Sequence, residues 1–361
     1  MQYGFSIKRK CYLLSVLLMT VWLTGCVQEE FESTPSPAGN GIRFTLTVPD
    51  VNLPSVSSRT MTGTGTAKKE DEIETVDILV FDMSKTPAVF LEWVSATGVT
   101  QDLADNSTVS FSAVLSPTTA STCIVVVANK ELDNIVSGFT KGATTKVEAM
   151  EKMLHTQTGK WLADGSTTGG YTRIPMYGEK VISKITPSMN PITEINMKRM
   201  LARIDIRNNS VTSNFTVEEV YLANHNTTGY IAPAWNTNGQ VTDPVPDTPV
   251  LPAGSGKMTE EGDVIRYSVN GNTPYDGEIY TFESLAAEDA GGAGADGEAS
   301  RKDATCLIVK GRIGTGESTF YRVDFTKNGN TGEQVEYLPL KRNYKYIITI
   351  TQALGTGYKS F

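Results

Sequence analysis

The stretch Ile42-Arg43-Phe44-Thr45-Leu46-Thr47-Val48 alternates strictly between apolar and polar side chains. Successive side chains of a strand point to opposite faces of its sheet, so this period of two predicts a strand with one buried face. Burial of these four apolar side chains contributes roughly 6–12 kcal/mol at about 1.5–3 kcal/mol each, an upper bound that compares with the whole stability of a domain. The predicted buried face consists of Ile42, Phe44, Leu46 and Val48.

Short apolar segments separated by turn residues follow along the rest of the chain. Two of them, residues 78–81 and 123–127, are continuous apolar runs, which are typical of strands buried on both faces. Residues 145–154 differ, because their apolar side chains fall on one helical face and Thr145 with Glu148 has the pattern of a capping box. Many short strands predict an all-β protein built from sandwiches, and 361 residues suffice for about two such domains. The predicted strands cover residues 42–48, 73–81, 88–94, 108–115, 122–128, 192–197, 202–208, 216–223, 264–269, 277–282, 304–312, 319–325 and 344–351.

The first 25 residues have the features of a secretory signal peptide. Lys8-Arg9-Lys10 precedes an apolar run over residues 11–23, which is too short for a comfortable membrane-spanning helix. The run ends in Leu23-Thr24-Gly25-Cys26, which resembles the bacterial lipobox, where the chain is cut before the cysteine and the thiol is diacylated. We expect a lipid anchor on Cys26, since two acyl chains hold a protein stably on a membrane. A plain signal peptide with a chance cysteine is the alternative.

The charge of the chain argues against two kinds of partner. Lys and Arg number 32 against 40 Asp and Glu, a net charge of −8, and loss of residues 1–25 leaves 29 bases, a net charge of −11. A nucleic-acid-binding protein usually carries a basic stripe, and an acidic surface is not drawn to anionic lipid headgroups. We therefore expect no nucleic-acid partner, and we expect attachment to a membrane through acyl chains alone.

Residues suited to catalysis or metal binding are scarce. The chain has only two histidines, His155 and His225, and the sequence suggests no acid–base or metal partner for either. Asp276 and Glu278 form a carboxylate pair, but they lie in a turn-like stretch and are better explained as solvated acids than as the two carboxyls of a glycosidase. The sequence therefore predicts no enzyme, no cofactor and no metal site.

Two cysteines follow Cys26. Cys123 and Cys306 each lie in an apolar run, so we expect buried thiols that pack as small hydrophobic side chains. A disulfide between them is the alternative.

Several local patterns stand in a particular order along the chain. A lipobox cysteine is followed by an alternating strand and then by an arginine in a turn, Ser58-Arg59-Thr60. Arg173-Ile174-Pro175-Met176-Tyr177-Gly178-Glu179 contains a Pro-Met-x-Gly turn, and strand-like stretches lie at residues 72–82, 198–206, 278–283 and 342–346. Taken together, these patterns resemble the fimbrillin family, the subunits of type V pili of outer-membrane bacteria.

The resemblance implies two tandem β-sandwich domains of the transthyretin-like type, the first with a short helix. It also implies a structural or adhesive pilus subunit that reaches the cell surface as a lipoprotein and is cut after an arginine by a trypsin-like protease. Arg59 is the expected cleavage site, with Thr60 as the new N-terminus, because it lies among small polar residues; Arg43 is the alternative, but it lies inside the predicted strand. The expected parts are a signal peptide (1–25), a lipidated propeptide with the removable strand (26–59), an N-terminal domain (60–190) and a C-terminal domain (191–361).

Loss of the first strand would open a hydrophobic groove and a free sheet edge, and a free edge invites a strand from another chain. In the family a neighbouring subunit supplies that strand, so the expected partners are other pilus subunits. The expected location is the cell outer membrane and then the extracellular fimbrium. An uncleaved first strand in a monomeric surface protein is the alternative.

The C-terminal segment bears on the position in the pilus. Shaft subunits of the family continue past the last domain strand with a donor segment, whereas only residues 352–361 follow the last strand predicted here. Ten residues span at most about 33–36 Å, and Gly355 and Gly357 lie within them. We therefore favour a tip or accessory subunit that accepts a strand and offers none. A shaft subunit whose strand 344–351 swings out is the runner-up, and an anchor is least favoured, because anchors keep their lipidated N-terminus.

A monomeric glycan-binding surface lipoprotein is the competing function. It would present an exposed aromatic platform, for which Trp161, Tyr171, Tyr230 and Trp235 are the candidates. Trp235, in a loop rich in Pro, Asn and Gly, is the residue best suited to contact a ligand, and a loop anchor packed on the sandwich is the other interpretation. A secreted hydrolase is a third class, which would require acids in a deep cleft. A receptor on a host or bacterial surface is compatible with a tip subunit.

Overall fold

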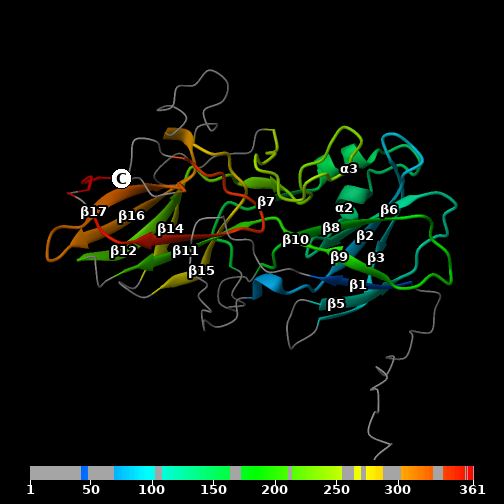
Figure 1. Cartoon of the computed structure of the whole chain (residues 1–361), viewed down its shortest axis with the longest axis horizontal. Coiled ribbons are helices and arrows are strands. Elements are labelled where there is room, and N and C mark those ends of the chain that lie inside the picture. The colour runs from blue at the N-terminus through cyan, green and yellow to red at the C-terminus, as the bar shows by residue number, and fades with distance from the viewer. Residues whose placement is uncertain are drawn as a thin grey trace, which may run out of the picture. The chain divides into compact units, whose positions relative to one another are not determined.

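The computed structural model describes residues 42–47, 69–101, 108–162, 172–209, 214–253, 264–269, 274–287, 302–327, 336–353, 355 and 357–360. Strands dominate these residues, which also contain two short α-helices, α2 (Asp133–Val136) and α3 (Lys146–Lys152) (Figure 1). The all-β prediction is therefore confirmed. None of the described helices is long and apolar enough to cross a membrane. Cys26, Val48, Arg59 and Thr60 lie outside the described residues.

The first sandwich consists of two sheets on either side of a hydrophobic core. One sheet has the strand order β4-β5-β1-β9 and the other the order β10-β8-β6-β2-β3. Alternate side chains from both sheets fill the core, among them Phe44, Ile78, Val126 and Ile195. The strands are β1 (Ile42–Thr47), β2 (Val76–Asp82), β3 (Val89–Ser95), β4 (Thr97–Gln101), β5 (Thr108–Ala113), β6 (Thr122–Ala128), β8 (Met176–Ile182), β9 (Ile192–Asn196) and β10 (Lys198–Arg199).

The other face of the five-stranded sheet is also buried. A second core, which includes Val125 of β6, Val136 of α2 and Met150 of α3, packs between this sheet and the helices. Every residue of β6 is buried, as its continuous apolar sequence predicts for a central strand covered on both faces.

The helix α3 begins at the capping box that the sequence predicts. Thr145 Oγ1 accepts a hydrogen bond of 3.2 Å from the backbone N–H of Glu148, and the Glu148 carboxylate accepts one of 2.7 Å from the backbone N–H of Thr145. The helix ends at Lys152, earlier than predicted, because Leu154 begins the strand β7 (Leu154–Thr156).

The second sandwich has the same two-layer plan. Its sheets have the strand orders β15-β11-β18 and β14-β12-β16-β17, and its core includes Ile204, Val220 and Leu307. The strand β13 (Thr228–Tyr230) pairs with β7, and the 3-10 turn η1 (Lys69–Asp71) precedes β2. The strands are β11 (Ala202–Asn208), β12 (Phe215–Ala223), β14 (Ile265–Ser268), β15 (Tyr275–Thr281), β16 (Cys306–Ile313), β17 (Thr319–Asp324) and β18 (Lys345–Ile350).

The strands β9 and β10 complete the sheets of the first sandwich. The expected division at residues 190 and 191 assigns both to the C-terminal half, yet β9 pairs with β1 and β10 pairs with β8. The chain therefore passes from the sheets of the first sandwich to those of the second between Arg199 and Ala202. Periodicity alone gives no sign of this change, because it shows which side chains are buried and not which strands are neighbours.

Arg342 and Glu283 form a buried ion pair, with 1% and 6% of their surfaces exposed. Arg342 donates to Glu283 Oε2 from Nη2 at 2.6 Å and from Nε at 2.9 Å, and its Nη1 donates to the carbonyl oxygen of Ile231 at 2.8 Å. The next residue, Asn343, accepts a hydrogen bond of 2.8 Å from Nη1 of Arg199. Since buried charges are unfavourable unless they are paired and hydrogen-bonded, this network fixes how the segments around Ile231, Glu283 and Arg342 meet.

Replacement of Glu283 by Gln should lower the free energy of unfolding by roughly 3–5 kcal/mol, because the Arg342 charge would stay buried without a counter-ion. The matched control is Glu336→Gln. Glu336 pairs with Lys327 at 3.0 Å, but the two side chains are 58% and 41% exposed, so its loss should lower the free energy of unfolding by less than about 1 kcal/mol. Urea denaturation followed by tryptophan fluorescence measures both, and equally small effects would contradict this role of the buried pair.

Candidate functional site

The first strand, β1, lies in the interior of its sheet, between β5 and β9 (Figure 1). Ile42, Phe44 and Leu46 point into the core and are at most 5% exposed. The Phe44 ring stacks on Phe111 of β5, with 5.0 Å between ring centroids and 7° between ring planes. The structure thus buries the three described residues of the face that the alternation predicts.

The two neighbours of β1 hold it differently. All six residues of β1 pair in antiparallel with residues 108–113 of β5. By contrast, β9 runs parallel to β1, and its register shifts between Phe44 and Leu46. Glu194 of β9 has a φ of 61°, which is uncommon for a residue other than glycine and fits a local bulge. The β5 side of β1 is therefore regular and the β9 side irregular.

Removal of β1 would leave a slot with a free strand on each side. Both β5 and β9 would lose hydrogen-bonding neighbours, and apolar side chains such as Phe111 and Ile195 would lose their cover. Unpaired strands with an adjacent apolar surface favour the addition of another strand. The slot is therefore the candidate functional site.

The turn η1, the first described element after Arg59, is fixed by polar contacts. The Glu70 carboxylate accepts hydrogen bonds from Arg203 Nη1 at 3.1 Å and from the Tyr280 hydroxyl at 2.9 Å. Asp71 forms an ion pair with Arg199, whose Nε donates to the carbonyl oxygen of Glu70 at 3.2 Å. Sequence reasoning missed these contacts, because Glu70 and Arg203 are 133 positions apart.

Trp235 packs on the protein. Its ring lies edge-on to that of Tyr230, with centroids 5.0 Å apart and planes at 81°, and it contacts the core on the helix side of the sheet. Trp161 is 3% exposed, and its Nε1 donates to the carbonyl oxygen of Thr172 at 2.8 Å. Tyr171 lies outside the described residues. These positions fit a loop anchor better than a platform, and ligand contact at Trp235 stays a prediction.

Cys123 and Cys306 are free and buried. Burial raises the pKa of Cys123 to about 12 and that of Cys306 to about 11, so neither thiol is a ready nucleophile at neutral pH.

The ring of His155 lies 5.0 Å from that of Trp161, and burial lowers the pKa of His155 to about 4. Asp276 forms an ion pair with Arg207, and among the described residues no group of three or more His, Cys, Asp or Glu could hold a metal ion.

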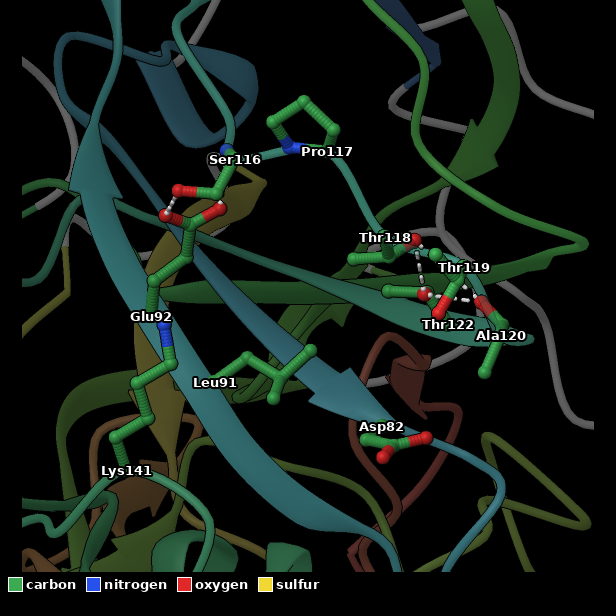
Figure 2. Close-up of a pocket in the computed structure, with 10 residues that line it drawn as sticks. All are labelled: Asp82, Leu91, Glu92, Ser116, Pro117, Thr118, Thr119, Ala120, Thr122 and Lys141. Carbon is green, nitrogen blue, oxygen red and sulfur yellow. Dashed lines mark hydrogen bonds between the residues drawn. The ribbon is translucent and has the colours of Figure 1, made fainter.

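A pocket of about 240 Å³ lies where β2 ends and β6 begins (Figure 2). Figure 2 shows the Glu92 carboxylate facing Ser116, whose backbone N–H and hydroxyl each donate to it at 2.7 Å. The hydroxyls of Thr118 and Thr122 lie 2.9 Å apart, and Thr122 also donates to the carbonyl oxygen of Ala120 at 2.9 Å. These polar groups thus bind one another, as they do in a well-packed loop, and the arrangement does not suggest a binding site.

Replacement of Phe44 by Ala should lower the free energy of unfolding by roughly 3–5 kcal/mol, because a fully buried ring is lost and a cavity remains. Thr45→Ala is the control, since Thr45 lies in the same strand on its opposite, half-exposed face, and its effect should be within about 0.5–1 kcal/mol. Urea denaturation compares the two variants. A Phe44→Ala effect no larger than that of the control would show that β1 does not hold the sandwich together.

Acidification should destabilise the protein through His155. Its pKa is about 4 in the fold against about 6.5 in an unfolded chain, so between these pH values the unfolded state binds the extra proton and unfolding becomes easier as the pH falls. The free energy of unfolding should therefore decrease from about pH 7.5 to about pH 5, and it should decrease less in His155→Phe, which keeps a packed ring. Identical pH dependence in the two proteins would contradict a buried, neutral His155.

Comparison with known proteins gives a family match and several similar solved structures. No curated protein matches the chain. Similar solved structures include the tip fimbrial protein Mfa3 from Porphyromonas gingivalis with a C-terminal truncation, which is 16% identical with a TM-score of 0.49 over 87% of this chain and 96% of that one. A putative cell adhesion protein from Parabacteroides distasonis is 17% identical (TM-score 0.46, 86% and 88% covered), and another from Bacteroides eggerthii is 13% identical (TM-score 0.44, 86% and 98% covered). The family model described as major fimbrial subunit protein (FimA) matches residues 42–245, more than half of the sequence, and the chain therefore belongs to this fimbrial subunit family.

Proposed function

We propose that this fimbrial subunit is exported as a lipoprotein anchored through Cys26, cut by a trypsin-like protease after Arg59 and assembled by strand exchange. A strand of a neighbouring subunit would then take the place of β1. Within the pilus we propose a tip or accessory position. The family consists of fimbrial subunits, so the proposed role is structural and adhesive.

The interior position of β1 is the observation that carries this proposal. β1 is connected to η1 through residues 48–68, which include Arg59. A cut after Arg59 would leave β1 held only by its pairing with β5 and β9 and by its buried side chains. The turn η1 would keep its own contacts, because Glu70 is bound by Arg203 and Tyr280. An incoming strand with the same alternation would restore both the hydrogen bonds and the apolar contacts.

Contacts near the C-terminus support a subunit that accepts a strand and offers none. The last strand, β18, pairs in parallel with six residues of β11. The Tyr346 hydroxyl donates to the carbonyl oxygen of Pro339 at 2.6 Å and accepts from the backbone N–H of Lys341 at 2.9 Å. Further on, Tyr358 exchanges two backbone hydrogen bonds of 2.9 Å with Phe320 of β17. β18 and the segment around Tyr358 are thus both paired within their own sandwich. The shaft alternative is favoured by a different feature, the position of β18 at the edge of its sheet.

An arginine-specific, trypsin-like protease should convert the full chain to a product that begins at Thr60, as read by N-terminal sequencing and mass spectrometry. Arg59→Gln should abolish this cut. Arg43→Gln is the matched control and should leave the cut unchanged, because Arg43 lies inside the paired strand β1.

The cleaved subunit should then bind the donor strand of a partner pilin, and the uncleaved subunit should bind it far more weakly. It should also remain monomeric without a partner, as measured by size-exclusion chromatography with light scattering. Resistance to cleavage at Arg59, or failure of the cleaved protein to exchange its first strand, would contradict the proposed assembly. Polymerisation of the cleaved subunit alone would contradict the tip position and favour the shaft.

A further inference from the structure

A second cavity, of about 320 Å³, lies where β8 and β10 meet the loop that follows β13. Lys198 is the register partner of Tyr177, and opposite residues of an antiparallel pair share a face. Tyr177 belongs to the core on the helix side of the sheet, so the Lys198 side of this cavity faces away from the core that β1 completes. Binding sites for small molecules begin at roughly this volume, about 300 Å³. Its walls include Glu179, Glu194, Asn196, Lys198, Pro233, Val241 and Pro244.

Lys198 brings a positive charge to the cavity. Its side chain is half-buried, and among the described residues none forms a hydrogen bond or an ion pair with its ammonium group. Burial lowers the pKa of Lys198. The carboxylate of Glu194, which also lines the cavity, pairs instead with Lys180 at 3.2 Å. A half-buried cation without a partner is unfavourable, so an anion placed against Lys198 would be bound favourably.

Glu179 supplies a fixed hydrogen-bond acceptor. Its Oε2 accepts from Lys146 Nζ at 2.6 Å and also from the Tyr177 hydroxyl. Lys146 is only 1% exposed and compensates the charge of Glu179. The other oxygen, Oε1, has no partner among the described residues. Because the carboxylate charge is already balanced, this oxygen is better suited to accept from a neutral hydroxyl than to bind a second cation.

The apolar wall of the cavity comes from an ordered loop. Asn236 Oδ1 accepts hydrogen bonds from the backbone N–H groups of Asn238 and Gln240 at 2.9 and 3.0 Å. Gly239 has a φ of 76°, and a Cβ atom there would lie 3.0 Å from Cβ of Lys146, so the loop sits directly on α3. Trp235 packs on Tyr230 in the same loop. The wall is therefore in place before any ligand binds, which lowers the entropy lost on binding.

We propose that this cavity binds a sugar unit that carries a carboxylate, of the hexuronate class. The ligand carboxylate pairs with the Lys198 ammonium group, its hydroxyls bind Glu179 Oε1 and the Asn196 amide, and its C–H face lies against Pro233 and Val241. The pocket of Figure 2 lacks this combination, because both oxygens of its Glu92 are engaged by Ser116. The proposal does not rest on strand exchange, since it concerns the chain with β1 in place.

The test is a titration of the full, uncleaved chain with methyl β-D-glucuronide, followed by NMR or calorimetry. Methyl β-D-glucoside, which differs only in the carboxylate, should bind at least about tenfold more weakly, as should the glucuronide to Lys198→Gln, because a charge-assisted hydrogen bond is lost in each case. Lys141→Gln is the matched control. It removes a lysine from the pocket of Figure 2 and should leave the affinity unchanged.

Three results would overturn the proposal. Equal binding of the glucoside and the glucuronide would exclude recognition of the carboxylate. Equal binding of acetate and the glucuronide would exclude recognition of the sugar. If Lys141→Gln lost binding and Lys198→Gln kept it, the binding site would lie in the pocket of Figure 2. Circular dichroism checks that each variant is folded. Asn196→Ala, on the exposed side of the cavity, should independently lower the affinity for the glucuronide.

Discussion

The first sandwich depends on the pairing of β1 with strands on both of its sides. β1 joins β5 to β9, so without it the four-stranded sheet would split into a hairpin of β4 and β5 and a lone strand. Phe44 and Leu46 are fully buried in the core beneath. β1 is the first strand that the structure describes, and it is central in its sheet, so the proposed cut after Arg59 would detach a strand on which the sheet depends. These two properties together favour an assembly in which another strand takes its place.

A set of buried charges connects segments that are distant in sequence. Arg342 binds Glu283 and the carbonyl oxygen of Ile231, while Arg199 binds both Asn343 and Asp71. Such groups add little net stability, because their desolvation offsets much of their attraction, but each requires its partners in a defined place. Their contribution is therefore one of specificity, since they hold η1 on the strands that bear Arg199 and Arg203, independently of β1.

The strand β9 borders both the slot that β1 fills and the cavity beside Lys198. Its Ile195 packs in the core under β1, and the next residue, Asn196, is the register partner of Thr47 and lines the cavity beside Lys198. Gly178 lets the chain pass closely here, because a Cβ atom at that position would lie 2.7 Å from Sδ of Met197 and 2.8 Å from Cγ2 of Ile195. Strand exchange would thus take place in the four-stranded sheet, on one side of β9, and ligand binding beside β8 and β10 of the five-stranded sheet, where Asn196 of β9 also lines the cavity.

The sequence by itself determined the elements whose signals are local. The alternation of residues 42–47 gave the buried face of β1, the pair Thr145 and Glu148 gave the start of α3, and the order of the motifs pointed to the fimbrial family. Only the tertiary structure decided that β1 lies between β5 and a bulged, parallel β9, and that the chain passes from the first sandwich to the second after Arg199. It also placed Lys198 beside Glu179 and the loop around Val241, where no residue that the structure describes pairs with its ammonium group. The reason is physical: periodicity records which side chains avoid water, whereas strand neighbours, buried ion pairs and cavities depend on residues that are far apart in the chain and meet only when it folds.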